Sequence, residues 1–214
     1  TDFPQVVGGE AGPAAAGEWR DSVDPSTGAV WARVPASGAA DVVIGAGDFG
    51  SVHEGVTETI AALATITAPT LLVPGNNETE EELRAAVAES GWDAATVLHG
   101  GGASIGGVEF YGLGAGVPTT PWDWSFDLTE DEAAARLADC PQGAVLIVHS
   151  PPRGHCDRSA AGEHLGSVAI LATIEMKRPP LVVCGHIHEA WGERSEIDGS
   201  AIANLGPHGA ELEV

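Results

Sequence analysis

The stretch LVVCGHIHEAWG (Leu181–Gly192) places two histidines shortly after an apolar run. Four apolar residues in succession are typical of a strand that is buried on both faces. A glycine ends this run, and His186 and His188 follow one residue apart. On a non-helical turn, two imidazoles with this spacing can reach one cavity, although a histidine at a strand end is also commonly a hydrogen-bonded core residue. The pair suggests a metal site that other segments must support.

Three further apolar runs are followed by polar residues whose side chains can also bind a metal ion. DVVIGAGD (41–48) ends at Asp48, TLLVPGN (70–76) ends at Asn76, and AVLIVHS (144–150) carries His149. Each residue alone is weak evidence, because an aspartate after a strand often caps a helix and PGN is commonly a turn. Together they fall at the carboxyl ends of predicted strands, where layered α/β folds place their ligand sites.

Helical patterns separate these strands. They cover residues 57–66, 78–90, 129–139 and 165–178. The third opens with a capping-box pattern, Thr129 to Glu132, and the fourth is stopped by Pro179 and Pro180. Glycine-broken runs predict a hairpin of 103–105 with 108–113, and two short strands are expected near 192–197 and 200–204.

The amino-terminal segment is harder to interpret. Residues 1–40 are rich in Gly, Ala, Pro and Ser and carry weak periodicity. We expect Ala29–Val34 to be helical and leave the rest of this segment poorly assigned. The whole chain, residues 1–214, is expected to form a single α/β domain.

Charge restricts the partners. The chain has 31 Asp and Glu against 9 Lys and Arg, a net charge of -22, with Lys177 as its one lysine. This balance disfavours binding to a nucleic-acid backbone or to an anionic membrane. It fits an acidic, solvated surface, or carboxylates that recruit divalent cations.

Cysteine usage and hydropathy indicate the compartment. Cys140, Cys156 and Cys184 form no CxxC pair, and their odd number argues against a disulfide framework. We expect Cys184, at the end of an apolar run, to be a buried thiol. No apolar run approaches the length of a membrane span and no signal peptide is visible, so a cytoplasmic location is expected.

The ordered set GD, GN, H and GHxH resembles the calcineurin-like metallophosphoesterase superfamily over about residues 41–206. The resemblance implies a two-sheet α/β/β/α sandwich whose first strand is missing or altered here. It also implies two divalent metal ions (Mn, Fe or Zn) and a metal-bridged hydroxide as nucleophile. Asp48 would bridge the ions. One ion would be completed by Asn76, His149 and His186, and the other would be bound by His188 and Asp2.

The first motif of that family, D-x-H, departs from the pattern. Asp2 fits its aspartate, but Pro4 stands where the histidine belongs, and proline cannot bind a metal. Asp21 and Asp24 are alternative carboxylates, although neither follows a strand-like run. His53 is an alternative imidazole, and a surface histidine at a helix start is the simpler account of it.

The third motif reads GNNE, with Asn77 where many members of the family have histidine. An amide donates a hydrogen bond but cannot act as a general acid, which favours a phosphodiesterase over a monoesterase. Asn77 and Asp48 are therefore the candidate catalytic residues, and the substrate would be a small phosphodiester or a nucleotide. We expect Glu78 to cap the following helix or to support the ligands from behind.

Aromatic and basic side chains complete the candidate site. Trp122, Trp124 and Trp191 either wall the site and stack on a base or pack as ordinary loop aromatics. Arg153 either contacts a phosphate or is solvated. Two alternatives to an active phosphodiesterase remain: an attenuated member that binds a nucleotide or metal without turnover, and a structural domain whose histidines only fill hydrogen bonds.

Overall fold

The structure, a computed structural model, describes residues 5–7, 10–12, 19–23, 30–35 and 41–214. Strands β1 (Gln5–Val7) and β2 (Glu10–Gly12) pair antiparallel, as do β3 (Trp19–Val23) and β4 (Val30–Pro35). The helix expected at Ala29–Val34 is therefore wrong over residues 30–34, while Ala29 lies outside the described residues. The stretch VWARV is rich in β-branched and aromatic residues, which suit a paired strand. None of these four described strands joins a larger sheet.

Two sheets form the body of the molecule. The smaller is fully parallel, with the order β5 (Val43–Gly45), β6 (Thr70–Leu72), β7 (Ala95–Val97). The larger has six strands in the order β12-β13-β11-β10-β9-β8. Its strands are β8 (Gly101–Ile105), β9 (Val108–Leu113), β10 (Val145–Val148), β11 (Leu181–Cys184), β12 (Arg194–Ile197) and β13 (Ser200–Asn204). The central strands β9, β10, β11 and β13 run parallel, and the edge strands β8 and β12 pair antiparallel.

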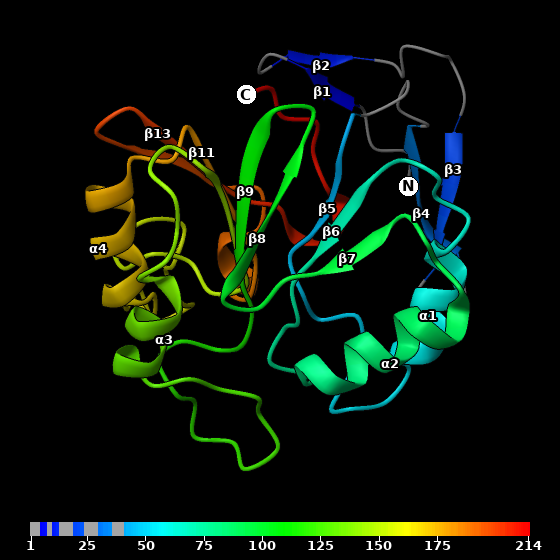
Figure 1. Cartoon of the computed structure of the whole chain (residues 1–214), viewed down its shortest axis with the longest axis horizontal. Helices are drawn as coiled ribbons and strands as arrows, with labels where there is room; N and C mark the ends of the chain where they lie inside the picture. The colour runs from blue at the N-terminus through cyan, green and yellow to red at the C-terminus, as the bar shows by residue number, and fades with distance from the viewer. Residues whose placement is uncertain (1–4, 8–9, 13–18, 24–29, 36–40) are drawn as a thin grey trace.

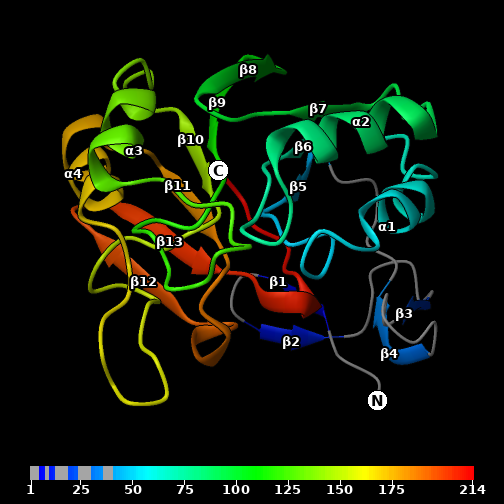
Figure 2. The same ribbon diagram turned by 90° about the horizontal axis from the view of Figure 1, so that it is seen from below.

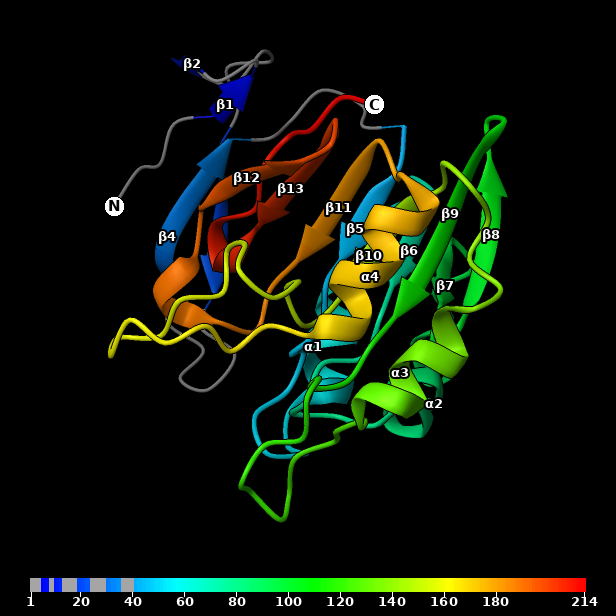
Figure 3. The ribbon, with the colours of Figure 1, turned by 90° about the vertical axis from the view of Figure 1, so that its left-hand side faces the viewer.

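Helices cover the outer faces of both sheets (Figure 1). Helices α1 (Val56–Leu63) and α2 (Glu80–Ser90) pack on the small sheet, and α3 (Glu130–Leu137) and α4 (Val168–Lys177) pack on the large one. Figure 2 shows the two helix pairs at opposite sides of the molecule, and Figure 3 shows α3 and α4 in front of the large sheet. Two short 3₁₀ helices, η1 (His188–Ala190) and η2 (Gly206–His208), follow β11 and β13.

Alternation along the strands divides the core into three layers. Leu71 and Ile147 pack between the two sheets, whereas Leu72 faces α1 and α2, and Leu146 faces α3 and α4. Successive side chains of a strand point to opposite faces, so continuous apolar strands bury both. This arrangement confirms the α/β/β/α sandwich expected from the sequence.

Local signals place the helix ends. The capping box of Thr129 with Glu132 is present as predicted, and a second one joins Thr79 to Glu82 at the start of α2. Because Thr79 is the N-cap of α2, the expectation that Glu78 caps this helix is wrong. The predicted hairpin is confirmed as β8 and β9, and Cys184 is a fully buried thiol.

Asp157 orders the loop between β10 and α4, which contributes to the wall of the cavity described below. Its carboxylate accepts hydrogen bonds from the backbone N–H groups of Gly154 and Gly166, both at 2.9 Å, and lies 2.6 Å from His164 Nδ1. Burial raises the pKa of Asp157, but the hydrogen bonds from His164 and the two glycines outweigh it, and the net pKa lies below its usual value.

We expect Asp157→Asn to lower the free energy of unfolding by about 2 kcal/mol near neutral pH, because an amide cannot replace all three accepted bonds. A carboxyl with a depressed folded pKa stabilises fully above its unfolded pKa of about 3.9, and this contribution is lost as the pH falls through the folded pKa. Urea unfolding between pH 7 and pH 3 should show the two proteins converging at acid pH. Asp139→Asn, an exposed control, should follow wild type, and an unchanged gap at low pH would contradict the assignment.

Candidate metal centre

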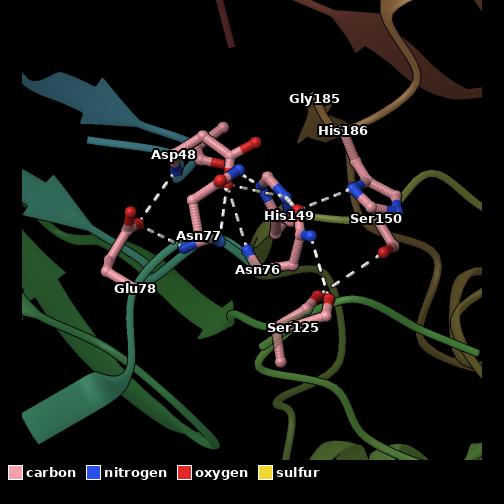
Figure 4. Close-up of polar contacts among 12 residues, drawn as sticks. Asp48, Asn76, Asn77, Glu78, Ser125, His149, Ser150, Gly185 and His186 are labelled. Carbon is pink, nitrogen blue, oxygen red and sulfur yellow. Dashed lines mark hydrogen bonds and ion pairs between the residues drawn. The ribbon is translucent and has the colours of Figure 1, made fainter. Parts of the chain in front are cut away.

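Four of the predicted ligands meet where the two sheets adjoin (Figure 4). Asp48 and Asn76 follow β5 and β6 of the small sheet, and His149 and His186 follow β10 and β11 of the large one. Ligand atoms of Asp48, His149 and His186 all lie within 4.8 Å of one another. Asn76 Oδ1 lies 3.2 Å from His149 Nε2 and 3.1 Å from His186 Nδ1. Strands that are far apart in the chain thus bring four donor groups to one point.

The carbonyl oxygen of Ala46 decides which ring nitrogen of His149 carries a proton in the neutral form. His149 Nδ1 lies 2.7 Å from Ala46 O, and a carbonyl only accepts, so Nδ1 carries the proton. In the neutral ring, Nε2 then presents a lone pair to Asn76 Oδ1 at 3.2 Å and to Asp48 Oδ1 at 3.5 Å. Three acceptors that face one another repel unless a cation or a proton lies among them. The donor set of imidazole, amide and carboxylate therefore fits a transition-metal ion.

Asn76 is held with its oxygen toward the histidines. Its Nδ2 donates to Ser125 Oγ at 2.9 Å, and Ser125 Oγ donates to Asp127 Oδ1 at 2.7 Å. The preceding residue must be glycine, because a Cβ on Gly75 would collide with the carboxylate and backbone of Asp48. This explains the PGN turn, whose sequence alone is unremarkable.

Glu78 supports the two loops that carry Asp48 and Asn76. Its buried carboxylate accepts hydrogen bonds from the backbone N–H groups of Asp48 (2.9 Å), Gly75 (2.6 Å) and Gly50 (3.1 Å). Asp48 has a left-handed backbone with φ of 60°. Such a conformation costs free energy in a non-glycine residue, and the bonds to Glu78 offset that cost. Of the two roles expected for Glu78, support behind the ligands agrees with these contacts.

The pKa values of two candidate ligands, Asp48 and His186, favour the protonation states that bind a cation. Burial raises the pKa of Asp48, but the neighbouring His149 and hydrogen bonds from Asn77 outweigh it, so the net pKa is below its usual value. Burial, together with repulsion from His149, lowers the pKa of His186 to about 3. At neutral pH, therefore, Asp48 is ionised and His186 is neutral, the forms in which both bind metals.

Of the remaining predicted ligands, His188 does not join this cluster, and Asp2 cannot be compared with it. Asp2 lies outside the described residues, as does the alternative Asp24, while Asp21 lies on β3. His188 is exposed on η1, and its ring packs against Trp191 with centroids 4.3 Å apart. His53 makes its hydrogen bonds to Glu82 and to the backbone of Trp124. Within the described part of the chain, one ligand set is assembled, and a second metal remains a prediction.

A cavity of about 560 Å³ opens beside the cluster. Trp122 and Trp124 form part of its wall and stack at 5.5 Å with an interplanar angle of 11°. Its described lining residues include no lysine or arginine. Arg153 donates instead to His164 O, and Trp191 lies outside the lining. The lining consists of Asp48, Asn76, Asn77, Pro118, Thr119, Thr120, Pro121, Trp122, Trp124, Ser159, Leu165, His186, Ile187, His188 and Glu189.

Asn77 lies between the cluster and a surface turn. Its backbone N–H donates to Asp48 Oδ1 at 3.1 Å, and its side-chain Oδ1 accepts from Val52 N at 2.9 Å. It also lines the cavity. Its side-chain oxygen is therefore committed to positioning, and its amide nitrogen, which also interacts with Asp48, has a second hydrogen that can be donated to a ligand.

Metal binding should stabilise the fold by mass action. We expect Mn²⁺ at about 100 times its dissociation constant to raise the melting temperature by about 5 to 10 °C. Asp48→Asn and His149→Ala should abolish that shift, whereas His155→Ala, a histidine outside the cluster, should retain it. Melts of the chelator-stripped protein with and without Mn²⁺, together with elemental analysis, measure both effects. A shift that survives in both ligand variants would place the binding site elsewhere.

Replacing Glu78 should weaken the loops without removing a ligand. We expect Glu78→Gln to lower the free energy of unfolding by about 3 kcal/mol, because its amide nitrogen would face at least one of the three backbone N–H donors in this buried site. The exposed Glu81→Gln serves as the control. Urea unfolding of the metal-free proteins measures the difference, and equal stability of the two variants would contradict the supporting role of Glu78.

Among the described residues, no helix combines the length and apolar character needed to cross a bilayer.

Known proteins resemble the chain at three levels. The nematode UPF0046 protein T07D4.2 of Caenorhabditis elegans is 35% identical over 97 residues, a match that spans 40% of this chain and 22% of that protein. Crystal structures share the fold: TT1561 of Thermus thermophilus, 18% identical with a TM-score of 0.61, covers 78% of this chain and 77% of its own. A second crystal structure is 22% identical with a TM-score of 0.61, covering 72% of this chain and 64% of its own.

The sequence itself matches the calcineurin-like phosphoesterase superfamily domain over residues 29–213, which is most of the chain. The match includes every strand end that carries a candidate ligand, together with the cavity beside them. The chain belongs to the calcineurin-like phosphoesterase superfamily.

Proposed function

We propose that this chain is a metal-dependent phosphodiesterase that acts on small phosphodiesters or nucleotides. The observation that carries the proposal is the convergence of Asp48, Asn76, His149 and His186 beside a cavity whose described lining contains no lysine or arginine. Membership of a phosphoesterase superfamily supports the reaction class.

These four side chains would hold a divalent cation such as Mn, Fe or Zn. When bound, such an ion polarises phosphoryl oxygens and lowers the pKa of a coordinated water. The contribution of the chain is to orient the side-chain atoms that would bind the ion. Ala46 O fixes the proton of His149 on Nδ1, and Ser125 Oγ fixes the amide of Asn76. Preorganised donors of this kind lose little free energy to reorganisation during the reaction.

Charge favours a diester over a monoester. A phosphate monoester carries close to two negative charges at neutral pH, whereas a diester carries one. Among the described residues, the cavity offers no lysine or arginine to the phosphate, and it contains the carboxylate of Glu189 in addition to that of Asp48. The lower charge of a diester therefore suits this cavity better.

The apolar wall favours a substrate with a flat group. Trp122 is about half exposed (52%), and it stacks on Trp124 in the same wall. An exposed indole face is a platform for a nucleobase or an aromatic ester, and such stacking contributes about 1–3 kcal/mol per base. Asn77 is placed to donate one hydrogen bond from its amide nitrogen, although it cannot protonate a leaving group. A substrate with a stable leaving group would need no such acid.

We expect the Mn²⁺-loaded protein to hydrolyse bis(p-nitrophenyl) phosphate with a kcat/KM at least about tenfold above that for p-nitrophenyl phosphate, since one unit of unfavourable charge is removed. Asp48→Asn should abolish the activity. Trp122→Ala should raise KM for the diester about tenfold while kcat changes little. Release of p-nitrophenol measures all three.

The alternative function is binding without turnover. It is favoured by the position of His188, which lies apart from the other ligands and packs on Trp191. Calorimetry with a nucleotide would then show saturable binding while no product forms. Metal-dependent release of p-nitrophenol that Asp48→Asn removes would rule this alternative out.

A further inference from the structure

The wall of the cavity is formed by a loop whose tip has few attachments. We name residues 118–127 the tryptophan loop. Its base is anchored, because Phe126 N donates to Asn76 O at 2.9 Å and Asp127 accepts from Thr120 and Ser125. In the described part of the chain, one hydrogen bond joins residues 121–124 to another segment, and it runs from His53 Nε2 to Trp124 O at 2.6 Å.

His53 bridges this loop to helix α2. Its Nδ1 lies 2.9 Å from Glu82 Oε2, while its Nε2 contacts Trp124 O. A carboxylate and a carbonyl only accept, so both ring nitrogens must carry protons for both bonds to form. The bridge therefore needs the imidazolium form, and a neutral ring can make only one of the two bonds.

The turn that carries His53 is held in an unfavourable conformation. Val52 and His53 both have left-handed backbones, with φ of 50° and 65°. The left-handed region is uncommon for non-glycine residues and is especially costly for a β-branched one such as Val52. Asn77 holds the turn in place, since its Oδ1 accepts from Val52 N (2.9 Å) and its backbone O accepts from His53 N (2.7 Å). The same residue borders the candidate metal centre.

The groups around His53 favour its charged form. Glu82 bonds to it, Glu78 lies near enough to add attraction, and Glu58 and Glu89 line the recess that His53 and Glu82 share between α1 and α2. The hydrogen bond to Glu82 raises the pKa of His53, and the bond to Trp124 O raises it further. Every charged group that lines this recess with His53 is acidic.

We propose that His53 is a positioning residue that clamps the tryptophan loop to helix α2 and so sets one wall of the cavity that the candidate metal centre also lines. It contacts neither the candidate ligands nor the cavity. It acts through Trp124, whose indole stacks on that of Trp122. Its effect on substrate binding rests on the proposed function, whereas its effect on the loop does not.

The test compares His53→Phe, which keeps a ring and removes both bonds, with Val52→Ala, a matched control on the same turn. Val52 has an exposed side chain, and its substitution leaves the backbone bonds to Asn77 in place. The first readout needs no substrate: the circular-dichroism couplet of the stacked indoles, identified as the signal that Trp122→Phe removes. We expect His53→Phe to lose most of this couplet and Val52→Ala to retain it.

The second readout is kinetic. With the diester substrate, we expect His53→Phe to raise KM about tenfold with kcat within about twofold, as the loss of a charge-assisted bond predicts. His53→Gln, which can donate to one partner at a time, should fall between wild type and His53→Phe, and it serves if the phenylalanine variant folds poorly.

The third readout is the pH profile. A histidine whose folded pKa is raised keeps its bridge below that pKa and loses it as the pH rises through it. The couplet of wild type should therefore persist at the usual histidine pKa of about 6.5 and weaken as the pH rises above it, and that of His53→Phe should not change with pH. The proposal would be overturned if His53→Phe kept the full couplet and an unchanged KM, or if the couplet of His53→Phe varied with pH in the same way as that of wild type.

If wild type hydrolyses no diester, the proposed function fails, and the couplet alone still decides the role of His53.

Discussion

The candidate metal centre depends on the hydrogen bonds that the buried carboxylate of Glu78 accepts. These bonds come from the N–H groups of Asp48, Gly50 and Gly75, so one side chain joins the loop after β5 to the loop after β6. Asp48 can keep its left-handed backbone only because other contacts offset the cost. The position of the central carboxylate is therefore set by a neighbour that need not touch the metal. A change at this neighbour would move Asp48 and Asn76 together, because both loops share it.

The spacing of the GHIH motif does not indicate which of its two histidines joins the ligand cluster. His186 adopts a left-handed backbone that turns its ring toward Asn76, whereas His188 starts the 3₁₀ helix η1 and packs on Trp191. In a strand, residues i and i+2 such as these two histidines would point to the same face. The turn after β11 is not a strand, so their side chains diverge. The sequence indicates the chemistry of this segment, and the local backbone decides which imidazole enters the cluster.

Much of the fold follows from local patterns in the sequence. Continuous apolar runs mark β5, β6, β10 and β11, and the polar residues after them are those that meet in space. The wrong expectations have a common cause, which is that contacts with another segment of the chain, rather than the local sequence, decide the structure at each position. β4 is a strand because it pairs with β3, and Glu78 turns inward because the loop after β5 offers it N–H donors. The contact of His53 with Trp124 spans 71 positions and has no local signature.

The candidate ligands are divided between the two sheets, since Asp48 and Asn76 extend from the small sheet and His149 and His186 from the large one. An ion held by all four would be a cross-link across the seam of the sandwich, in addition to any role in chemistry. Separation of either sheet from the other would then remove two of the four protein ligands from the ion. Unfolding of the two halves would be joined into a single cooperative event, and loss of the ion would let them separate in sequence.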